Sequence, residues 1–272
     1  MTGFNIRIGR FLPKDENIVI LPVDAGMFMG VRERFEDVPA ILRELHNFDV
    51  VMLSPGMLER CASTFARRGA PASVVRINWN SNYCFQWGYE QGNTTLSLTP
   101  EEAVILGADA AVASLAVATG DPAVDAANVE VFTRIMAEKR KAGLPVGGEV
   151  YPVGSNKPGT PEFNEIVSST CRMVAELGAD FAKTFYTDDA SFARLVAAVP
   201  IPLLVLGAEK MPREIDALTL AEKAVRAGAR GIVFGRNVML ARSPQRMLDA
   251  LNDVVKRGVD ARTAASKCGI EY

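Results

Sequence analysis

Short apolar runs recur along the whole chain and are separated by longer amphipathic stretches. Most runs are almost continuously hydrophobic and rich in Val, Ile and Leu, which is typical of parallel strands buried on both faces of a sheet. We therefore expect eight strands, in residues 18–26, 50–56, 73–79, 110–118, 145–154, 180–187, 202–210 and 231–237.

Between these runs, apolar residues recur at spacings of three and four, the period of a helix that packs one face on a core. Thr99-Pro100, Thr160-Pro161 and Ser243-Pro244 each place proline after a capping residue, which favours a helix start. Several stretches reach a glycine at their end, as at Gly143, Gly178, Gly228 and Gly258. We expect helices within 38–48, 57–69, 100–108, 122–143, 160–179, 188–199, 212–229 and 243–258.

A strand followed by a helix, repeated eight times, predicts an α/β fold in which a parallel sheet closes into a (β/α)₈ TIM barrel. The length of 272 residues agrees with the roughly 250 residues typical of this barrel, so residues 1–272 are expected to form a single domain. An open, doubly wound sheet is the alternative. Such sheets usually have fewer repeats and often a Gly-rich dinucleotide loop, and no GxGxxG follows the first strand here.

One connection differs from an ordinary βα loop. The segment from about Asn80 to Leu98 is long and rich in aromatic and polar residues. We expect it either to lie over the mouth of the barrel or to make a subunit contact.

Composition narrows the classes of protein to consider. The chain has 30 basic and 32 acidic residues and a net charge of −2, a balance that does not favour general binding to nucleic acid or membrane surfaces. No apolar run approaches the roughly 18 residues of a membrane span, and the first twenty residues lack the pattern of a secretory signal. The four cysteines, with no CxxC, predict neither a disulfide framework nor a zinc site: Cys61, Cys84, Cys171 and Cys268. A cytoplasmic protein is expected.

His46 is the only histidine, and it lies near the end of a predicted helix, where histidine suits the helix dipole. A single histidine excludes mechanisms that need two and weakens any Ser-His-Asp hypothesis. Acid–base chemistry is therefore expected from Lys, Tyr, Asp or Glu.

Active sites in this fold form at the C-terminal ends of the strands, and Lys183 is the most notable ionisable residue there. It lies inside the apolar sixth run, next to Phe181 and Phe185. Burial favours the neutral amine of a lysine, which is the nucleophilic form, and such an amine attacks a carbonyl to form a Schiff base. The alternative is a structural lysine that faces outward or pairs with a carboxylate such as Asp24.

Two further candidates lie at strand ends. Tyr151 is either a proton shuttle for Schiff-base chemistry or a packed aromatic residue. Asp24 either assists the lysine or forms a turn before Ala25-Gly26. Glu149 is expected on the same side of its strand as Tyr151 and is a weaker candidate for acid–base work.

The last two predicted strands carry a separate signal. TIM barrels often bind phosphate with the loops that follow strands seven and eight. Glycine lets backbone N–H groups approach an anion, and an arginine or lysine adds charge. The phosphate-binding candidates are Gly207, Ala208, Lys210, Gly235 and Arg236, and the alternative is a tight turn with a surface arginine.

These residues form a set of motifs: Asp24-Ala25-Gly26, Tyr151-Pro152-Val153-Gly154, Ala179–Thr184, Gly207–Lys210 and Gly231–Asn237. With them, the chain from about Val19 to Leu251 resembles the class I aldolases of the DeoC/LacD superfamily. It looks most like the archaeal-type fructose-bisphosphate aldolases and their relatives, which include aminodideoxyheptulosonate synthases and the autoinducer-2 phosphate thiolase.

The resemblance implies a role for each motif. Lys183 would be the Schiff-base lysine, Tyr151 the acid–base tyrosine and Asp24 an assisting carboxylate, while Gly207, Gly235 and Arg236 would help to hold a phosphate. Members of this family need no metal or organic cofactor and often form large rings, commonly decamers. The expected activity is a lyase that cleaves or forms a C–C bond of a phosphorylated ketose.

Three positions depart from the family pattern. Ala25 replaces a common histidine, Ala208 replaces the second glycine of the seventh motif, and Glu149 replaces an aromatic residue two before the tyrosine. These changes surround the expected substrate. Two other functions stay open on the same fold: a transferase of acyl or ketoacid fragments, and a non-catalytic barrel that binds a sugar phosphate.

Overall fold

Parallel strands close into a barrel in the computed structural model, which describes residues 2–89, 91–153 and 159–271. Within those residues the barrel has eight strands, each paired with its neighbours and the last with the first. Each overlaps one of the eight predicted runs, and only β3 begins outside its run, one residue early at Ala72; the predicted (β/α)₈ fold is confirmed. The strands are β1 (Ile18–Pro22), β2 (Val50–Leu53), β3 (Ala72–Arg76), β6 (Ala110–Leu115), β7 (Val146–Val150), β8 (Ala182–Thr184), β9 (Leu203–Leu206) and β10 (Gly231–Val233).

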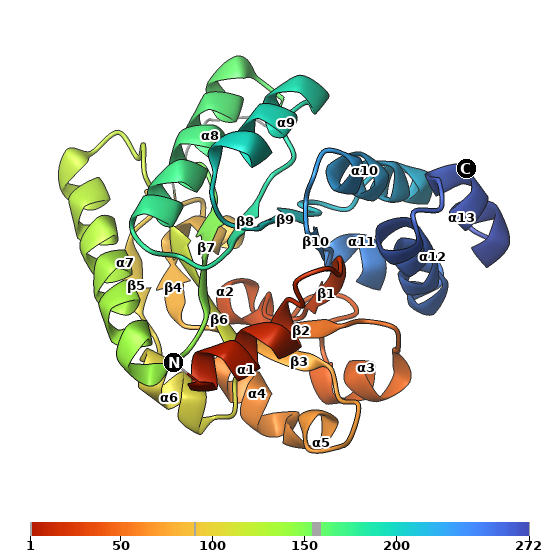
Figure 1. Ribbon diagram of the computed structural model, residues 1–272, viewed down its shortest axis with the longest axis horizontal. Coiled ribbons are helices and arrows are strands. Elements are labelled where there is room, and N and C mark those ends of the chain that lie inside the picture. The colour runs from red at the N-terminus through yellow and green to blue at the C-terminus, as the bar shows by residue number, and fades with distance from the viewer. Residues whose placement is uncertain (1, 90, 154–158, 272) are drawn as a thin grey trace.

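The predicted helices surround the barrel (Figure 1). Side chains of Thr99 and Thr160 cap two of them as expected, whereas Ser243 makes no side-chain cap bond. The stretch predicted over 57–69 is divided at Cys61 into two short helices. In the described part of the chain, no helix has the length and apolar character needed to cross a membrane. These helices are α3 (Val38–Glu44), α4 (Pro55–Arg60), α5 (Ala62–Phe65), α6 (Pro100–Ile105), α7 (Pro122–Ala142), α8 (Pro161–Glu176), α9 (Asp189–Ala198), α10 (Glu214–Arg226) and α12 (Pro244–Arg257).

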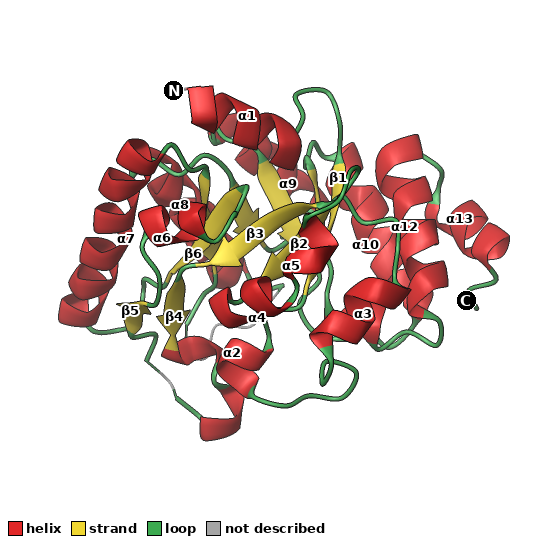
Figure 2. Cartoon of the chain, turned by 90° about the horizontal axis from the view of Figure 1, so that it is seen from below, coloured by secondary structure: helices red, strands yellow, loops and turns green. Residues whose placement is uncertain are grey.

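Four further helices were not predicted from the sequence: α1 (Thr2–Phe11), α2 (Gly26–Met29), α11 (Arg236–Met239) and α13 (Ala261–Cys268). Two glycines weaken the intrinsic helix propensity of α1, but its last residue, Phe11, is buried against the ring of Phe181 at 4.6 Å between centroids. Figure 2 shows α1 at one end of the barrel and α2 at the other. Tertiary packing therefore closes the N-terminal end of the barrel with α1.

In six of the barrel strands (β1, β2, β3, β6, β9 and β10), alternate residues belong to two separate hydrophobic clusters. In β2, Val50 and Met52 pack inside the barrel, while Val51 and Leu53 pack against the surrounding helices. All four are completely buried. Burial on both faces explains why the strands are continuously apolar in sequence.

The long connection after β3 forms a small antiparallel sheet of β4 (Asn78–Asn80) and β5 (Thr94–Leu96). Between them lie two 3₁₀ turns, η1 (Ser81–Tyr83) and η2 (Phe85–Trp87), and Glu90 lies outside the described residues. Tyr83 and Phe85 line the cavity at the mouth of the barrel. This segment therefore covers part of the mouth, which was the first of the two predicted arrangements.

Candidate active site

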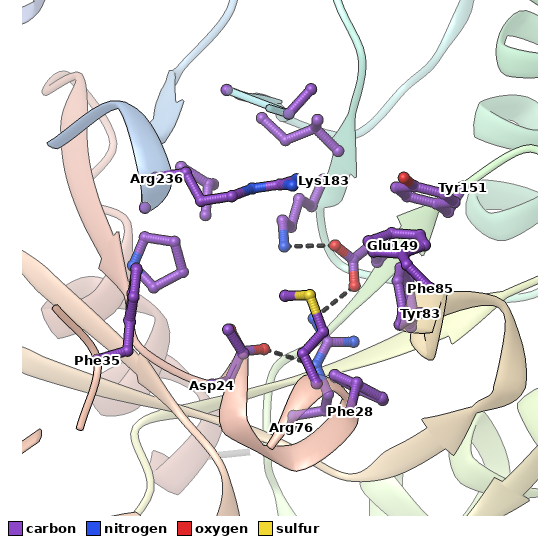
Figure 3. Close-up of a pocket in the computed structure, with 18 residues that line it drawn as sticks. Asp24, Phe28, Phe35, Arg76, Tyr83, Phe85, Glu149, Tyr151, Lys183 and Arg236 are labelled. Atoms are coloured by element: carbon purple, nitrogen blue, oxygen red, sulfur yellow. Dashed lines mark hydrogen bonds and ion pairs between the residues drawn. The ribbon is translucent and has the colours of Figure 1, made fainter. Parts of the chain in front are cut away.

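A cavity of about 120 Å³ opens at the C-terminal ends of the strands. Figure 3 shows charged and aromatic side chains from several strands pointing into it. The predicted residues Asp24, Tyr151, Lys183 and Arg236 all line this cavity, together with Arg76 and Glu149. Residues that are far apart in the sequence are thus brought to one site, at the end of the barrel where this fold places its chemistry.

Lys183 and Glu149 face each other on neighbouring strands. They are register partners in β7 and β8, so their side chains project to the same side of the sheet. Lys183 Nζ donates to Glu149 Oε1 in a buried ion pair, and Met52 Sδ lies 3.9 Å from the same nitrogen. The sequence suggested Asp24 as a possible partner of the lysine, but the structure assigns that position to Glu149, which had been considered the weaker candidate.

Arg76, at the end of β3, completes this arrangement and was not identified from the sequence. Its Nε donates to Asp24 Oδ2 at 2.6 Å, and its Nη2 lies 2.5 Å from Glu149 Oε2. Its Nη1 donates to Ser114 Oγ at 2.9 Å. A cation within the apolar run 73–79 was a signal of the same kind that identified Lys183, and it could have found this residue.

The four charged groups form one buried chain, in the order Asp24, Arg76, Glu149, Lys183, with alternating sign (Figure 3). Burial by itself raises the pKa of Glu149, but the charges of Arg76 and Lys183 and their hydrogen bonds outweigh it, and the pKa falls to about 2. The two carboxylates likewise hold the pKa of Arg76 above its usual value despite burial. Glu149 is therefore ionised at neutral pH.

We expect the stability of the protein to fall in acid partly because of Glu149. Its folded pKa, about 2, lies below the roughly 4.3 of an unfolded glutamate, so its contribution is full above that unfolded value and is lost as pH falls towards 2. Between pH 6 and pH 3 this amounts to about 2 kcal/mol. Urea unfolding at both pH values should show a smaller loss in Glu149→Gln than in the wild type, and equal losses would contradict the assignment.

An aromatic wall stands beside the charged chain. Tyr151 packs against Tyr83 at 4.9 Å and Phe185 at 5.2 Å between ring centroids, and the guanidinium carbon of Arg76 lies 5.4 Å from the centre of the Tyr83 ring. Burial raises the pKa of Tyr151 to about 12, with Glu149 adding to the effect and Arg236 opposing it. The phenol of Tyr151 is consequently protonated at neutral pH and is available as a proton donor.

Four of the five predicted phosphate-binding residues belong to the same cavity, which Arg236 enters opposite Tyr151 (Figure 3). Gly207, Ala208, Gly235 and Arg236 line it, whereas Lys210 is not among the lining residues. A side chain at Gly207 would collide with Phe234, at 2.8 Å from an added Cβ. Glycine is thus required here by close packing.

Asn237 holds the loop that follows β9. Its side-chain amide donates to the carbonyl oxygens of Gly207 at 2.8 Å and Glu209 at 3.0 Å, and its oxygen accepts from the N–H of Met211 at 2.9 Å. The side chain is completely buried. The asparagine of the eighth motif therefore positions the loop of the seventh.

Ala208 occupies a backbone conformation that favours glycine, with φ of +49°. We expect Ala208→Gly to stabilise the fold by up to about 1 kcal/mol, because it removes the strain of a left-handed alanine. Chemical unfolding measures the change. As a control, Ala193→Gly, at an exposed position in the middle of α9, should instead destabilise by about 1 kcal/mol. A loss of similar size in both variants would show that Ala208 is not strained.

Two other sequence observations lie outside this cavity. His46, just beyond the C-terminal end of α3, is exposed and donates its backbone N–H to Gln245 Oε1, in keeping with the helix end expected there. Gly154 of the fifth motif lies outside the described residues. In the part of the chain that the structure describes, no three His, Cys, Asp or Glu side chains gather as metal ligands.

Residues 18–241 match the DeoC/LacD family aldolase. Among curated proteins, the chain is 27% identical over 267 residues to an uncharacterized aldolase of Saccharolobus solfataricus, covering 96% of this chain and 97% of that protein. It is 28% identical over 264 residues to a 3-hydroxy-5-phosphonooxypentane-2,4-dione thiolase of Yersinia pestis, covering 96% of this chain and 85% of that protein.

Solved structures agree with this relationship. An archaeal fructose 1,6-bisphosphate aldolase superposes with a TM-score of 0.78 at 28% identity, covering 93% of this chain and 98% of that one. A Schiff-base-forming fructose-1,6-bisphosphate aldolase gives the same TM-score and identity, covering 93% of this chain and 99% of that one. The match over residues 18–241 spans most of the chain. The chain therefore belongs to the DeoC/LacD family of aldolases, and it is a class I, carbon–carbon bond lyase.

Proposed function

We propose that Lys183 forms the Schiff base of this aldolase with the carbonyl group of a phosphorylated ketose. The observation that carries this proposal is the position of its amine. Lys183 is 7% exposed, projects into the cavity at the C-terminal end of the barrel, and lies among ionisable side chains from four other strand ends. An amine in such a site is held ready for attack on a bound carbonyl.

The imine supplies the driving force for the reaction. A protonated imine draws electrons from the bond between the α- and β-carbons, which breaks when the hydroxyl on the β-carbon loses its proton. An aldehyde leaves and an enamine stays on the lysine. We assign the proton transfers to Tyr151, protonated at rest because burial raises its pKa, with Asp24 as an assisting carboxylate.

The phosphate of the substrate is proposed to bind on the opposite side of the cavity. Gly207, Ala208 and Gly235 provide backbone close to the cavity, and Arg236 provides a positive charge. Lys210 belongs to the same loop and is proposed to add charge from its edge. Since two of the solved relatives are fructose 1,6-bisphosphate aldolases, this ketose phosphate is the first substrate to test.

Borohydride trapping tests the proposal. The protein is incubated with fructose 1,6-bisphosphate, dihydroxyacetone phosphate and other phosphorylated ketoses, reduced, and analysed by peptide mass spectrometry. We expect a stable adduct at Lys183 and aldehyde release from the ketoses that are cleaved. Absence of an adduct with every compound, while a solved relative traps normally in the same assay, would refute the proposed Schiff base.

A transferase reaction is the second candidate, because one relative is named a thiolase. Adding coenzyme A to the same reactions separates the two functions. Products that appear only with coenzyme A and carry an acyl group would indicate transfer, whereas release of a free aldehyde without it indicates an aldolase. We propose the aldolase reaction because the family match and both solved relatives are aldolases.

We further infer that residues 1–272 form a single domain and that the protein is cytoplasmic. The location is supported by the four free cysteines, which fit a reducing compartment. We also infer a homo-oligomer, with a decamer as the first assembly to test. Trp87 and Tyr89 are about half exposed in the segment after β4, and aromatic side chains of this kind are common in subunit interfaces. Light scattering coupled to size-exclusion chromatography measures the number of subunits.

A further inference from the structure

Among the described residues, the nitrogen of Lys183 has one partner able to exchange a proton with it. In the described structure its neighbours within hydrogen-bonding distance are Glu149 Oε1 and Met52 Sδ, the latter at 3.9 Å. A thioether is a weak acceptor, whereas a carboxylate accepts and returns protons. Tyr151, the acid–base residue proposed above, makes no described hydrogen bond with this nitrogen. Proton transfer to and from this nitrogen therefore needs a group other than Tyr151.

Imine formation requires proton transfer from the lysine nitrogen to the carbonyl oxygen. In its ion pair with Glu149 the nitrogen counts as an ammonium with three protons. One proton must first leave the nitrogen to free its lone pair; the amine then attacks, the C–N bond forms and the π electrons of the carbonyl move to oxygen. Two of the three protons must reach that oxygen, which then leaves as water, and the third stays on the nitrogen of the positively charged iminium. Charge at nitrogen is the same before and after, but two protons have crossed from nitrogen to oxygen.

We infer that Glu149 is the catalytic residue that carries these protons between Lys183 Nζ and the departing oxygen, and that Arg76 is the positioning residue that orients it. The inference rests on the Schiff base proposed above. Glu149 takes a proton from nitrogen, gives it to oxygen, and is a carboxylate again at the end of each transfer. It then faces the iminium as its counter-ion.

The charged chain makes this carrier suitable. Glu149 uses one oxygen for Lys183 and the other for Arg76, so the carboxylate plane is fixed with Oε1 directed at the nitrogen. Lys183 is one of the charges that hold the pKa of Glu149 low. That contribution disappears when the nitrogen becomes neutral, so Glu149 becomes more basic at the step in which it must hold a proton.

Glu149→Gln tests the inference, because the amide keeps the shape of the side chain but accepts no proton at neutral pH. The probe is dihydroxyacetone phosphate, with borohydride added at timed intervals. We expect the rate of adduct formation at Lys183 to fall about 10²-fold, with a change of less than about threefold in the concentration of probe that gives half-maximal rate.

Asp180→Asn is the matched control. Asp180 pairs with a second buried lysine, Lys139, at 2.5 Å between Oδ2 and Nζ, but at the N-terminal end of β8, away from the cavity. Breaking that pair lowers stability and leaves the chemistry intact. We expect Asp180→Asn to form the adduct at the wild-type rate, which separates loss of a proton carrier from loss of stability.

A second variant guards against a Glu149→Gln protein that fails to fold. Glu149→Ala opens space next to Arg76, where added formate supplies a carboxylate. We expect formate to raise the rate of adduct formation roughly tenfold in this variant and not in the wild type. Wild-type adduct rates in Glu149→Gln, or no response of a folded Glu149→Ala to formate, would overturn the role of Glu149 alone. A wild type that gives no adduct would overturn the Schiff base itself.

Discussion

Replacing Lys183 with methionine is expected to abolish adduct formation and to lower activity by roughly 10⁴-fold or more, because removing a covalent nucleophile costs about as much as removing the whole catalytic unit. Methionine keeps an unbranched chain of similar length, so the packing inside the barrel is largely preserved. Activity is measured as aldehyde release, and the adduct by mass spectrometry after borohydride reduction.

The appropriate control is Lys139→Met. Lys139 is 5% exposed and also forms a buried ion pair, with Asp180, so replacing it should have a comparable effect on stability. Lys139 lies at the other end of the barrel, away from the cavity. We expect this variant to keep its activity while its unfolding midpoint falls. A Lys183→Met protein that kept more than a hundredth of the wild-type activity would show that another residue performs the chemistry.

Arg76→Met is expected to have the largest effect on stability, a loss of about 3–5 kcal/mol. Arg76 is 2% exposed and lies between two buried carboxylates, Asp24 and Glu149. Without it, Asp24 stays buried with its charge unpaired and Glu149 keeps only Lys183 as a partner, and this uncompensated burial is costly. Urea unfolding at neutral pH measures the loss.

The stability of the Arg76→Met variant should depend on pH differently from that of the wild type. Without Arg76, Glu149 loses the larger of the two charges that oppose the effect of burial, so the pKa of Glu149 rises and it binds a proton in the folded state more readily. The difference in stability between the variant and the wild type should therefore shrink as pH falls from 7 to 4. A difference that stays constant with pH would mean that lost packing, and not unpaired charge, causes the destabilisation.

Arg172→Met provides the comparison at the surface. Arg172 pairs with Glu176 on α8, and both side chains are more than half exposed. Exposed pairs of this kind contribute about 0.3–0.5 kcal/mol. We expect a loss of that size, roughly a tenth of the effect at Arg76, because solvent screens the surface pair and replaces its partner when one side is removed.

The buried chain of Asp24, Arg76, Glu149 and Lys183 is energetically costly, and the proposed chemistry explains why it is present in the barrel interior. Replacing buried ion pairs by apolar residues is often neutral or stabilising, and the rest of the interior consists of apolar residues such as Ile20 and Val74. Retaining Arg76 and Glu149 beside Lys183 is therefore better explained by the chemistry proposed for the site than by stability.

Much of the fold was predictable because it depends on local pattern. The eight apolar runs became eight strands, and the Thr-Pro starts at Thr99 and Thr160 became capped helices. These signals act over one or two turns of chain, so they are readable in sequence. Helix α1 was missed because its stability comes from contact between Phe11 and Phe181, 170 residues away.

Some residues of the candidate site were likewise identified from the sequence, and others only from the structure. Lys183, Tyr151, Asp24 and Arg236 were identified by residue type, strand position and motif, and the structure brings them into one cavity. Arg76 and the pairing of Lys183 with Glu149 were not identified. Which carboxylate meets the lysine depends on the register of β7 against β8, where Glu149 lies opposite Lys183, and on Arg76, which engages Asp24.

The sequence by itself therefore determined the barrel and the family and indicated the proposed nucleophile, since these follow from hydrophobic periodicity and from short motifs. Only the tertiary structure decided the electrostatic environment of that nucleophile. The strength of an ion pair depends on the distance between its charges and on their removal from water, and closure of the barrel set both for Asp24, Arg76, Glu149 and Lys183.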